Sequence, residues 1–339
     1  MRTDVATRLV PRTPAASVDE LVAGATERRP LVTGDGKSGS TLELVVIDGE
    51  RFVLKHLHPD ADWTMRGFGD LCCRPVAVWT TGLLDAVPAC IDHTVVGAAA
   101  PLGRNGWGGA LLLRDVSDHL FPVGDDPIDM ADHRMLLEHL AALSATFWES
   151  TQLPELLSLE SRWSAFGPAW MAAEEARGWP DEVPKIASEG WTRFATRAPR
   201  DVEMLIGELR RDLDPLARAA RRTPQTFLHG DWKLGNLGAA DGRTILLDWT
   251  YPGVGPAAHD LAWYLCLNRA RLPESKEDAI DAFRTSLEIH GIATAAWWHE
   301  QLSLCLLGAL VQFGWEKALG DDAELGWWCD RAREGARHL

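Results

Sequence analysis

The sequence lacks the features that would place it outside a reducing aqueous compartment. Its six cysteines form no Cys-x-x-Cys pair, and the adjacent Cys72 and Cys73 suit neither a zinc site nor a disulfide. Reduced thiols and a cytoplasmic location are therefore expected. The N-terminus has arginines but no apolar core, so no signal peptide is predicted. The most apolar run, residues 302–313, is too short to span a bilayer and predicts a buried core helix.

Positive charge is also scarce. The chain has 34 Lys and Arg against 49 Asp and Glu, a net charge of −15. Such an excess of acid argues against nucleic acid and against an anionic membrane as partners. It is compatible with a cationic small molecule. With 339 residues, of which 46% are hydrophobic, the chain has the length of one large or two medium globular domains.

A hairpin is the clearest element near the N-terminus. Two strands, residues 41–47 and 50–57, are joined by Asp48-Gly49, a strong signal for a two-residue turn. Side chains alternate along a strand, which puts Phe52 and Leu54 on one face of it and Val53 and Lys55 on the other. A short helix over residues 17–26 and a strand over 110–113 complete this region.

The second half of the chain is predicted to be helical. Leu136, Leu140, Leu143 and Phe147 follow a helical spacing, and so do Val202, Leu205, Leu209, Leu213 and Leu216. Residues 150–200 predict short helices, and the chain after Asp260 is helical again. The predicted fold class is α+β. It comprises a small N-terminal sheet lobe (1–113), a linker (114–125) and a larger, mostly helical C-terminal lobe (126–339).

The most informative stretch is Phe-Leu-His-Gly-Asp-Trp-Lys-Leu-Gly-Asn at 227–236, followed by Ile-Leu-Leu-Asp-Trp at 245–249. Each part places a carboxylate on a turn after an apolar strand. A surface turn is the alternative, because Gly, Asp and Asn are common turn formers. The order and the separation of the two parts favour a functional site.

This pattern, His-Gly-Asp-x-x-x-x-Asn and then an apolar strand ending in Asp, resembles the aminoglycoside phosphotransferase and choline kinase family. The resemblance covers about residues 33–315 and implies a bilobal protein-kinase-like fold. It also implies ATP and Mg²⁺ as cofactors and phosphoryl transfer to a hydroxyl group. Asp231 would be the catalytic base, and Asn236 and Asp248 the metal ligands. His229 would support the loop backbone.

Two further residues follow from the resemblance. Asp260 would accept hydrogen bonds from the catalytic loop, although it could also cap the apolar helix that follows it. Lys233 lies two residues after the catalytic aspartate, where protein kinases carry a lysine and many relatives a histidine. A cation there would neutralise charge on the transferred phosphoryl group. A solvated loop lysine is the alternative.

The segment from Gly34 to Thr41 has the appearance of a Walker A loop but departs from it, because position 31 is Leu instead of Gly and a strand follows instead of a helix. The resemblance implies a loop lying over the triphosphate, in which Gly34, Gly36 and Gly39 allow close backbone approach. Ser38, like Lys37 and Ser40, could add donors.

Lys55 is implied to bind the α- and β-phosphates, with Val53 covering the adenine and the backbone from Arg114 to Val116 reading its edge. An edge-strand lysine reaching water is the alternative for Lys55. The family usually orients this lysine with a glutamate, but no Glu occurs between Glu50 and Glu138. Three aspartates could replace it, of which the second has the most plausible separation: Asp62, Asp70 and Asp85.

The acceptor is expected to be a small molecule. Only twelve positions separate Asp248 from Asp260, and they contain no peptide-docking APE motif. Acid-rich segments near 174–182 and 316–324 favour an aminoglycoside-type antibiotic or amino sugar, so a cationic or polyhydroxylated molecule. A neutral sugar or another metabolite alcohol stays open, as does GTP in place of ATP. A catalytically silent ATP-binding regulatory protein is the alternative of another class, supported only by the missing glutamate.

Overall fold

The computed structural model describes residues 9–32, 38–100, 105–150, 153, 156–178 and 182–339. Internal contacts divide the chain into two compact units. Unit 1 is Met1–Asp126 with Asp231–Pro252, and unit 2 is Pro127–Gly230 with Gly253–Leu339. The predicted boundaries, at 113 and 126, make each lobe one continuous segment, and they stay a proposal. The division by contacts differs from them because it assigns residues 231–252 to the N-terminal unit.

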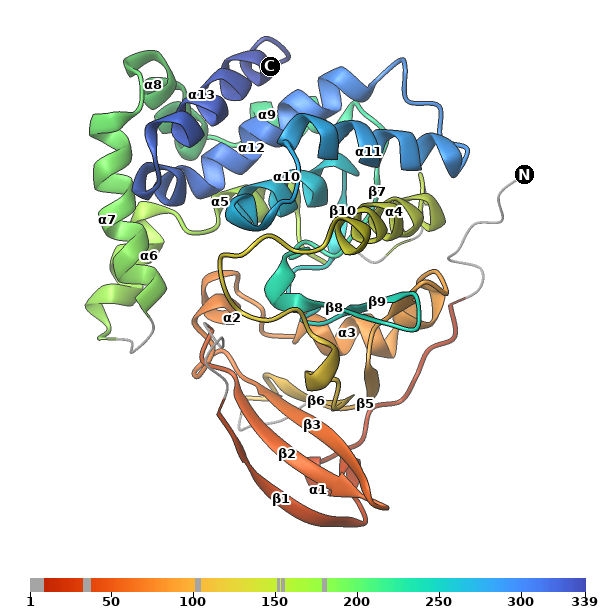
Figure 1. Cartoon of the computed structure of the whole chain (residues 1–339). Helices are drawn as coiled ribbons and strands as arrows, with labels where there is room; N and C mark the ends of the chain where they lie inside the picture. Colours follow the sequence, from red (N-terminus) through yellow and green to blue (C-terminus); the bar gives the residue numbers. More distant parts are fainter. Residues whose placement is uncertain (1–8, 33–37, 101–104, 151–152, 154–155, 179–181) are drawn as a thin grey trace. The chain divides into compact units, whose positions relative to one another are not determined.

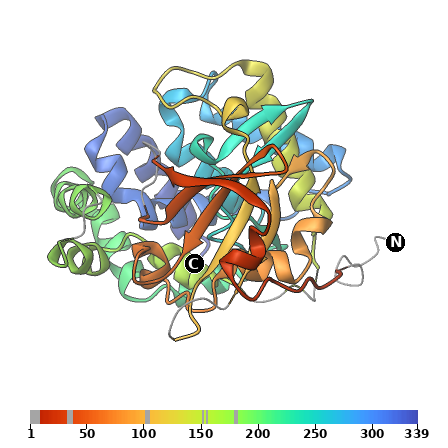
Figure 2. The same cartoon turned by 90° about the horizontal axis from the view of Figure 1, so that it is seen from below.

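Unit 1 is built on a five-stranded antiparallel sheet in the order β1-β2-β3-β6-β5 (Figures 1 and 2). The hairpin β2–β3 has the predicted bounds. At its turn, Asp48 (φ 51°) and Gly49 (φ 85°) both adopt the left-handed conformation that a two-residue turn of this type requires. The strands are β1 (Ala25–Leu31), β2 (Thr41–Ile47), β3 (Glu50–Leu57), β5 (Val95–Ala99) and β6 (Gly109–Arg114).

The alternation predicted for β3 is confirmed. Leu54 lies in a buried cluster with Val45, Ala110 and Leu112, and Phe52 packs against that cluster. Val53 and Lys55 therefore occupy the opposite face, where Lys55 is paired across the sheet with Leu111. The apolar face anchors the sheet, and the other face is the one that carries the lysine.

The helix predicted over residues 17–26 is wrong in extent. Only α1 (Val18–Leu21) is helical, capped by the side chain of Ser17, and β1 begins at Ala25. Gly24 adopts a φ of 86°, which ends the helical path, and pairing with β2 then holds the next residues extended. The strands β1 and β5 were not predicted. In β1, the sequence shows no alternation of apolar and polar residues, and its five central residues are all exposed.

A smaller three-stranded sheet, β4-β9-β8, completes unit 1. Its hairpin β8–β9 turns at Asp241 (φ 51°) and Gly242 (φ 70°). The remaining elements of this unit are short: α2 (Trp63–Gly67), α3 (Arg74–Thr80), η2 (Leu83–Ala86), β4 (Ile91–Asp92), η3 (Ser117–His119), η4 (Leu234–Asn236), β8 (Leu237–Ala240) and β9 (Arg243–Leu246).

Unit 2 is helical apart from the two-stranded pairing of β7 with β10. Its elements are α4 (Met130–Thr146), α5 (Leu159–Ser164), α6 (Pro168–Ala176), α7 (Glu182–Arg197), α8 (Arg200–Arg211), α9 (Asp214–Arg221), β7 (Thr226–Leu228), β10 (Gly253–Gly255), α10 (Ala258–Leu267), η5 (Arg269–Arg271), α11 (Lys276–Ile289), α12 (Trp298–Leu319) and α13 (Asp322–Ala336).

Helix α12 forms the centre of unit 2 and packs against α7, α10 and α13. Glycines allow these close approaches: a Cβ at Gly190 would lie 2.4 Å from the Trp315 carbonyl oxygen, and one at Gly335 would lie 2.4 Å from that of Ser303. The predicted core helix is confirmed, but it has 22 residues instead of the apolar run alone. Within the described residues it is the one helix long and apolar enough to cross a membrane, and 83% of its most apolar window is buried in the protein.

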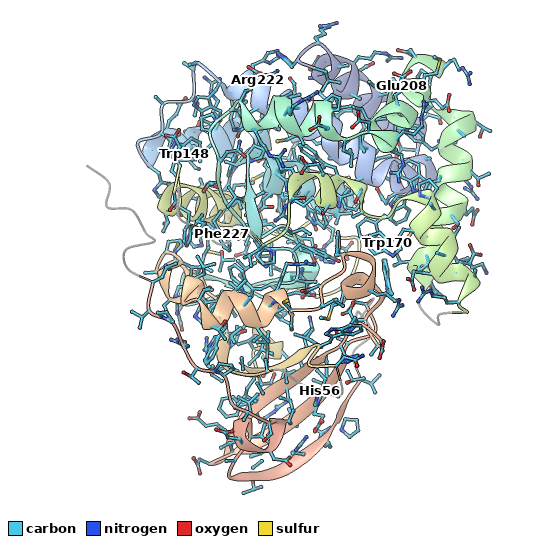
Figure 3. The ribbon with its side chains drawn as sticks, turned by 180° about the vertical axis from the view of Figure 1, so that it is seen from behind. His56, Trp148, Trp170, Glu208, Arg222 and Phe227 are labelled. Atoms are coloured by element: carbon cyan, nitrogen blue, oxygen red, sulfur yellow. The ribbon has the colours of Figure 1, made fainter. Side chains whose placement is uncertain are left out.

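Two other helical predictions needed correction. The stripe from Val202 to Leu216 is split into α8 and α9, because the chain leaves the helical conformation at Asp212 and restarts with Pro215 in the first turn. Helix α7, predicted as short pieces, has 16 residues. Phe227 on β7 is labelled in Figure 3. Its ring packs on that of Phe147 at the end of α4, with ring centroids 5.0 Å apart.

Candidate active site

In unit 1, an ion pair joins two of the predicted site residues, Lys55 and Asp248. The Lys55 Nζ lies 2.8 Å from the Asp248 Oδ1, and the side chains are 16% and 31% exposed. Strand β3 presents the lysine, and the turn after β9 presents the aspartate. The Thr250 hydroxyl also donates to the same carboxylate oxygen. Lys55 is therefore paired within the protein, and the alternative of an edge lysine reaching into water is wrong.

Asn236 and Asp231 form the second contact. The Asn236 Nδ2 donates to the Asp231 Oδ2 at 2.7 Å and to the Asp231 carbonyl oxygen at 3.0 Å. Both residues are buried, at 8% and 2% exposure. Because the amide nitrogen faces the aspartate, the amide oxygen of Asn236 is directed away from it, as a cation ligand would be.

The hairpin β8–β9 brings these residues to Asp248. Leu237 pairs with Leu246, and the Leu247 N–H donates to the Asn236 carbonyl at 2.9 Å. Asn236 thus lies beside the residue that precedes Asp248. The Asp-Gly turn at 241–242 sets this register, since a turn one residue longer would shift every pair. Asp248 itself has a φ of 58°, an uncommon value for a residue other than glycine and one that aspartate tolerates better than most.

Lys233 lies on the same loop. Its Nζ is 3.3 Å from the Asp231 Oδ2, and its side chain is 36% exposed. The ammonium group is thus held near the carboxylate predicted to act as the base but keeps contact with water. This placement fits either a group that meets developing negative charge or a loop cation that stabilises Asp231.

The charges of the pair shift both titrations. Burial alone would raise the pKa of Asp248, but the Lys55 ammonium and the hydrogen bonds from Lys55 and Thr250 lower it well below its ordinary value of 3.8. Burial alone would lower the pKa of Lys55, but Asp248, followed by Asp62 and Asp231, raises it above 10.5. The site therefore holds a charged ammonium and a charged carboxylate at neutral pH.

In unit 2, Asp260 of α10 binds the first residues of the predicted catalytic loop. Its carboxylate accepts the N–H of His229 at 2.9 Å and that of Gly230 at 3.0 Å. The side chain does not cap α10, whose first residue follows Ala257 without a side-chain hydrogen bond. Burial would raise the pKa of Asp260, but the hydrogen bond from His259 and its charge lower it. These are the contacts that the resemblance implies, and the supporting roles of His229 and Asp260 stay proposals.

The predicted phosphate loop is only partly described. Gly34, Gly36 and Lys37 lie outside the described residues. Ser38 and Gly39 are described: the Ser38 carbonyl accepts the N–H of Trp63 at 3.0 Å, and Gly39 has a φ of 92°. The end of the loop that precedes β2 is therefore held by a hydrogen bond. The role of the loop in binding a triphosphate stays a prediction.

The predicted adenine contacts have mixed support. Val53 shares the face of Lys55 and pairs with Leu113 of β6. At the predicted hinge, the Arg114 N–H donates to the Thr94 carbonyl at 3.0 Å, and the next N–H, that of Asp115, also donates to a backbone carbonyl. Backbone reading of adenine over 114–116 would therefore use other groups of the hinge, among them those of the buried Val116.

The expectation that Asp70 replaces the missing glutamate beside Lys55 is wrong. Both Asp70 carboxylate oxygens accept the Arg74 N–H at 3.0 Å, at the start of α3. Asp85 forms an exposed ion pair with Arg12. The direct partner of Lys55 is instead Asp248. Of the three proposed aspartates, Asp62 is the one among the leading charges that raise the pKa of Lys55.

The donor set fits a divalent cation that is shared with phosphate groups. Across the ranges that the structure describes, no three His, Cys, Asp or Glu side chains cluster as a metal site. A metal held jointly by protein and phosphate does not require one, because Mg²⁺ is commonly bound through one or two protein oxygens together with substrate phosphates. The Asp248 carboxylate and the Asn236 amide oxygen fit that description.

Comparisons with known proteins identify the fold. The choline kinase LicA from Streptococcus pneumoniae superposes with a TM-score of 0.51 at 14% identity, over 95% of this chain and 96% of that one. A microcompartment-associated aminopropanol kinase superposes with a TM-score of 0.50 at 13% identity, over 92% and 90%. The fold is thus that of the protein-kinase-like small-molecule kinases. No curated protein sequence matches the chain.

Residues 44–298 match the sequence profile of the phosphotransferase enzyme family. The chain belongs to this family and is a small-molecule phosphotransferase. The alternative of a catalytically silent regulatory protein rested on the missing glutamate alone, and Lys55 has a carboxylate partner without it. Sequence reasoning missed two neighbours of the site, Thr250 and Tyr251. Both follow Asp248 in the Asp-Trp-Thr-Tyr run, which carries no family signal of its own.

Proposed function

We propose that the chain transfers the γ-phosphoryl group of ATP, with Mg²⁺, to a hydroxyl group of a small molecule. The observation that carries the proposal is the close set in unit 1, with Lys55 2.8 Å from Asp248 and Asn236 2.7 Å from Asp231. A lysine for phosphate, two oxygen donors for a cation and a carboxylate for the acceptor are the parts that phosphoryl transfer needs.

Four side chains divide the work of phosphoryl transfer in this proposal. Lys55 binds the α- and β-phosphates, and the Asp248 carboxylate with the Asn236 amide oxygen holds the cation, which neutralises charge on the phosphates. Asp231 orients the acceptor hydroxyl and takes its proton, a contribution on the order of 10²–10⁴ in rate. Its hydrogen bond from the Asn236 amide fixes the direction of the carboxylate.

We further propose a cytoplasmic enzyme whose acceptor is an aminoglycoside-type molecule or an amino sugar, with a neutral sugar or other alcohol as the alternative. The support from charge is narrower than the sequence suggested. In the second acidic cluster, Asp321 caps α13, Asp322 pairs with Arg197, and Glu324 pairs with Lys276 at 2.6 Å. In the first cluster, Glu175 and Glu182 are exposed, and these two carboxylates are the remaining support for a cationic acceptor.

The experiment is an ADP-release assay with Mg²⁺ and a panel of aminoglycosides, amino sugars and neutral sugars. Asp248→Ala should lower turnover by about 10²–10³-fold, because several kcal/mol of charge stabilisation leave with the cation. Asp241→Asn is the matched control: Asp241 is exposed in the β8–β9 turn, where asparagine is also favoured, and should leave turnover unchanged. Wild-type turnover in Asp248→Ala would contradict the proposed cation site.

A further inference from the structure

Asp62 is a buried carboxylate at the start of α2, 1% exposed. Its Oδ1 accepts the N–H groups of Thr64 at 2.9 Å and Met65 at 3.0 Å, and the Thr64 hydroxyl at 2.6 Å. These contacts make it the N-cap of a helix of only five residues. Capping accounts for one carboxylate oxygen and leaves the second to be explained.

The second oxygen holds the described end of the predicted phosphate loop. The Ser40 hydroxyl donates to the Asp62 Oδ2 at 2.7 Å, and the Ser38 hydroxyl lies 3.3 Å from that of Ser40. Next to Asp62, the Trp63 N–H donates to the Ser38 carbonyl at 3.0 Å. The segment Ser38–Ser40 is thus fixed to the N-terminus of α2 through one carboxylate and one N–H group.

The same carboxylate acts on the site residues. Its charge raises the pKa of Lys55, next in importance to the Asp248 carboxylate among the charges that do so. Tyr251, three residues after Asp248, is buried, and its pKa is raised first by burial and then by Asp231, Asp62 and Asp248. Asp62 is therefore near enough to Lys55 and Tyr251 for its charge to act on both, and it is not a cap on a distant surface.

We propose that Asp62 is a positioning residue for nucleotide binding, which fixes the Ser38–Ser40 segment relative to Lys55 in place of the glutamate that this chain lacks. An aspartate is shorter than a glutamate, and Asp62 acts from the N-cap of α2, a short helix that begins soon after β3 ends. The inference rests on the proposed function, because it assumes that Ser38–Ser40 and Lys55 bind the triphosphate. It does not make Asp62 a phosphate or metal ligand.

The test is Asp62→Asn. Asparagine is as good an N-cap as aspartate, so α2 keeps its start. Its amide group, however, carries no charge, and if the amide oxygen caps α2, the amide nitrogen cannot accept from Ser40. We expect the KM for ATP to rise about tenfold while kcat changes by less than about threefold, the pattern for lost binding with intact chemistry. Calorimetric titration with the β,γ-imido analogue of ATP and Mg²⁺ should show the same loss of affinity without any turnover.

Asp70→Asn is the matched control. Asp70 is equally buried, at 2% exposure, but both of its carboxylate oxygens accept the Arg74 N–H at the start of α3, whereas Asp62 also accepts the Ser40 hydroxyl. The same chemical change there should leave the KM for ATP unaltered. A purely structural role for Asp62 predicts instead that the two variants lose stability alike and bind nucleotide alike.

Ser40→Ala provides a second arm that does not touch the helix cap, in case Asp62→Asn fails to fold. It should reproduce part of the rise in KM. The double variant of Asp62→Asn and Ser40→Ala should raise KM by less than the two single effects combined, because both changes remove the same contact. Unchanged affinity in Ser40→Ala, or equal affinity in Asp62→Asn and Asp70→Asn, would overturn this inference alone. A wild-type protein that binds no nucleotide with Mg²⁺ would overturn the proposed function and this inference with it.

Discussion

Lys55 and Asp248 are 193 positions apart in sequence, and their charged groups meet at 2.8 Å. Each is the other's main electrostatic partner, since Asp248 is the leading charge on Lys55 and Lys55 the leading charge on Asp248. A magnesium–triphosphate carries both charges that this pair needs, a cation for Asp248 and an anion for Lys55. Under the proposed function, Asp248 exchanges Lys55 for the magnesium ion, and Lys55 exchanges Asp248 for the phosphates. Every charge therefore stays compensated.

The first prediction compares two lysines. Lys55→Ala should lower kcat/KM by at least about 10²-fold, because a preorganised cation on a strand is lost from the phosphates. Lys37→Ala should cost less than about threefold, because the sequence predicts a flexible cation there that water can replace. Steady-state kinetics with ATP as the varied substrate measure both. A larger loss in Lys37→Ala than in Lys55→Ala would show that the wrong lysine has been assigned to the phosphates.

Lys55→Ala also leaves Asp248 without its main cation. Loss of one partner from a buried ion pair costs about 3–5 kcal/mol, and this pair should cost less, because Asp248 is 31% exposed. Urea unfolding of the variant gives this number separately from the kinetics. A variant that stays folded under assay conditions but loses ATP affinity supports a role in binding.

The second prediction concerns the pH dependence of the same pair. The pKa of Asp248 is lowered in the folded state, so its contribution to stability is present above the unfolded value of 3.8 and is lost as the pH falls through the folded value. The pKa of Lys55 is raised, so its contribution is present below 10.5 and lost as the pH rises beyond it. The pair should therefore contribute a constant amount from about pH 5 to 9.

Urea unfolding of wild type and Asp248→Asn at several pH values measures this contribution as the difference between their free energies of unfolding. We expect the difference to be flat across neutral pH and to shrink in acid below about pH 4. A difference that changes steadily between pH 6 and 8 would mean that another group, such as a histidine, controls the stability of the site.

The sequence predicted the parts of the fold whose signals are local. The hairpin β2–β3 was placed at its observed bounds, because Asp48-Gly49 fixes both the turn and the register. The candidate site residues Asp231, Asn236 and Asp248 were predicted from a local signal too, their order and spacing, and their roles stay predictions. The edge strand β1 was missed, because Thr26 to Pro30 are exposed and owe their extended form to pairing with β2.

The partner of Lys55 shows why other parts were out of reach. Asp70 was favoured by its distance along the sequence, but it lies at the start of α3 and accepts the Arg74 N–H. Asp62 lies on a helix of five residues, too short to give any periodic signal. A tertiary contact such as that of Ser40 with Asp62 depends on how the chain folds between them, which no local pattern records.

The third prediction concerns thiol reactivity. None of the described cysteines forms a disulfide; Cys72 is exposed, whereas Cys73 is buried. Burial, and then the Asp70 carboxylate, raises the pKa of Cys73 to about 12, and burial raises that of Cys266 to about 12 and that of Cys329 to about 11. At pH 8, a disulfide reagent should therefore modify Cys72 fastest, because the thiolate is the reactive form. Cys72→Ser should remove the fast phase, and a fast phase that survives in this variant would contradict the assignment.

The last prediction tests Lys233, whose Nζ is 3.3 Å from the Asp231 Oδ2. If its cation meets charge that grows only in the transition state, Lys233→Ala should lower kcat with little change in the KM for ATP. The expected loss is roughly 2–4 kcal/mol, the scale for one preorganised donor. Lys233→His should keep part of the activity, because an imidazole can still donate a hydrogen bond to the phosphoryl oxygens.

Lys185→Ala is the matched control for this experiment, since Lys185 is an exposed lysine of α7 and its loss should change neither constant. Thermal unfolding of all three variants should stay close to that of the wild type, because a loop lysine that is 36% exposed adds little to folding stability. A folded Lys233→Ala protein with unchanged kcat would assign this residue to the solvated surface of the loop. An unfolded one would make its contact with Asp231 structural, and in both cases the transferred phosphoryl group would need another source of positive charge.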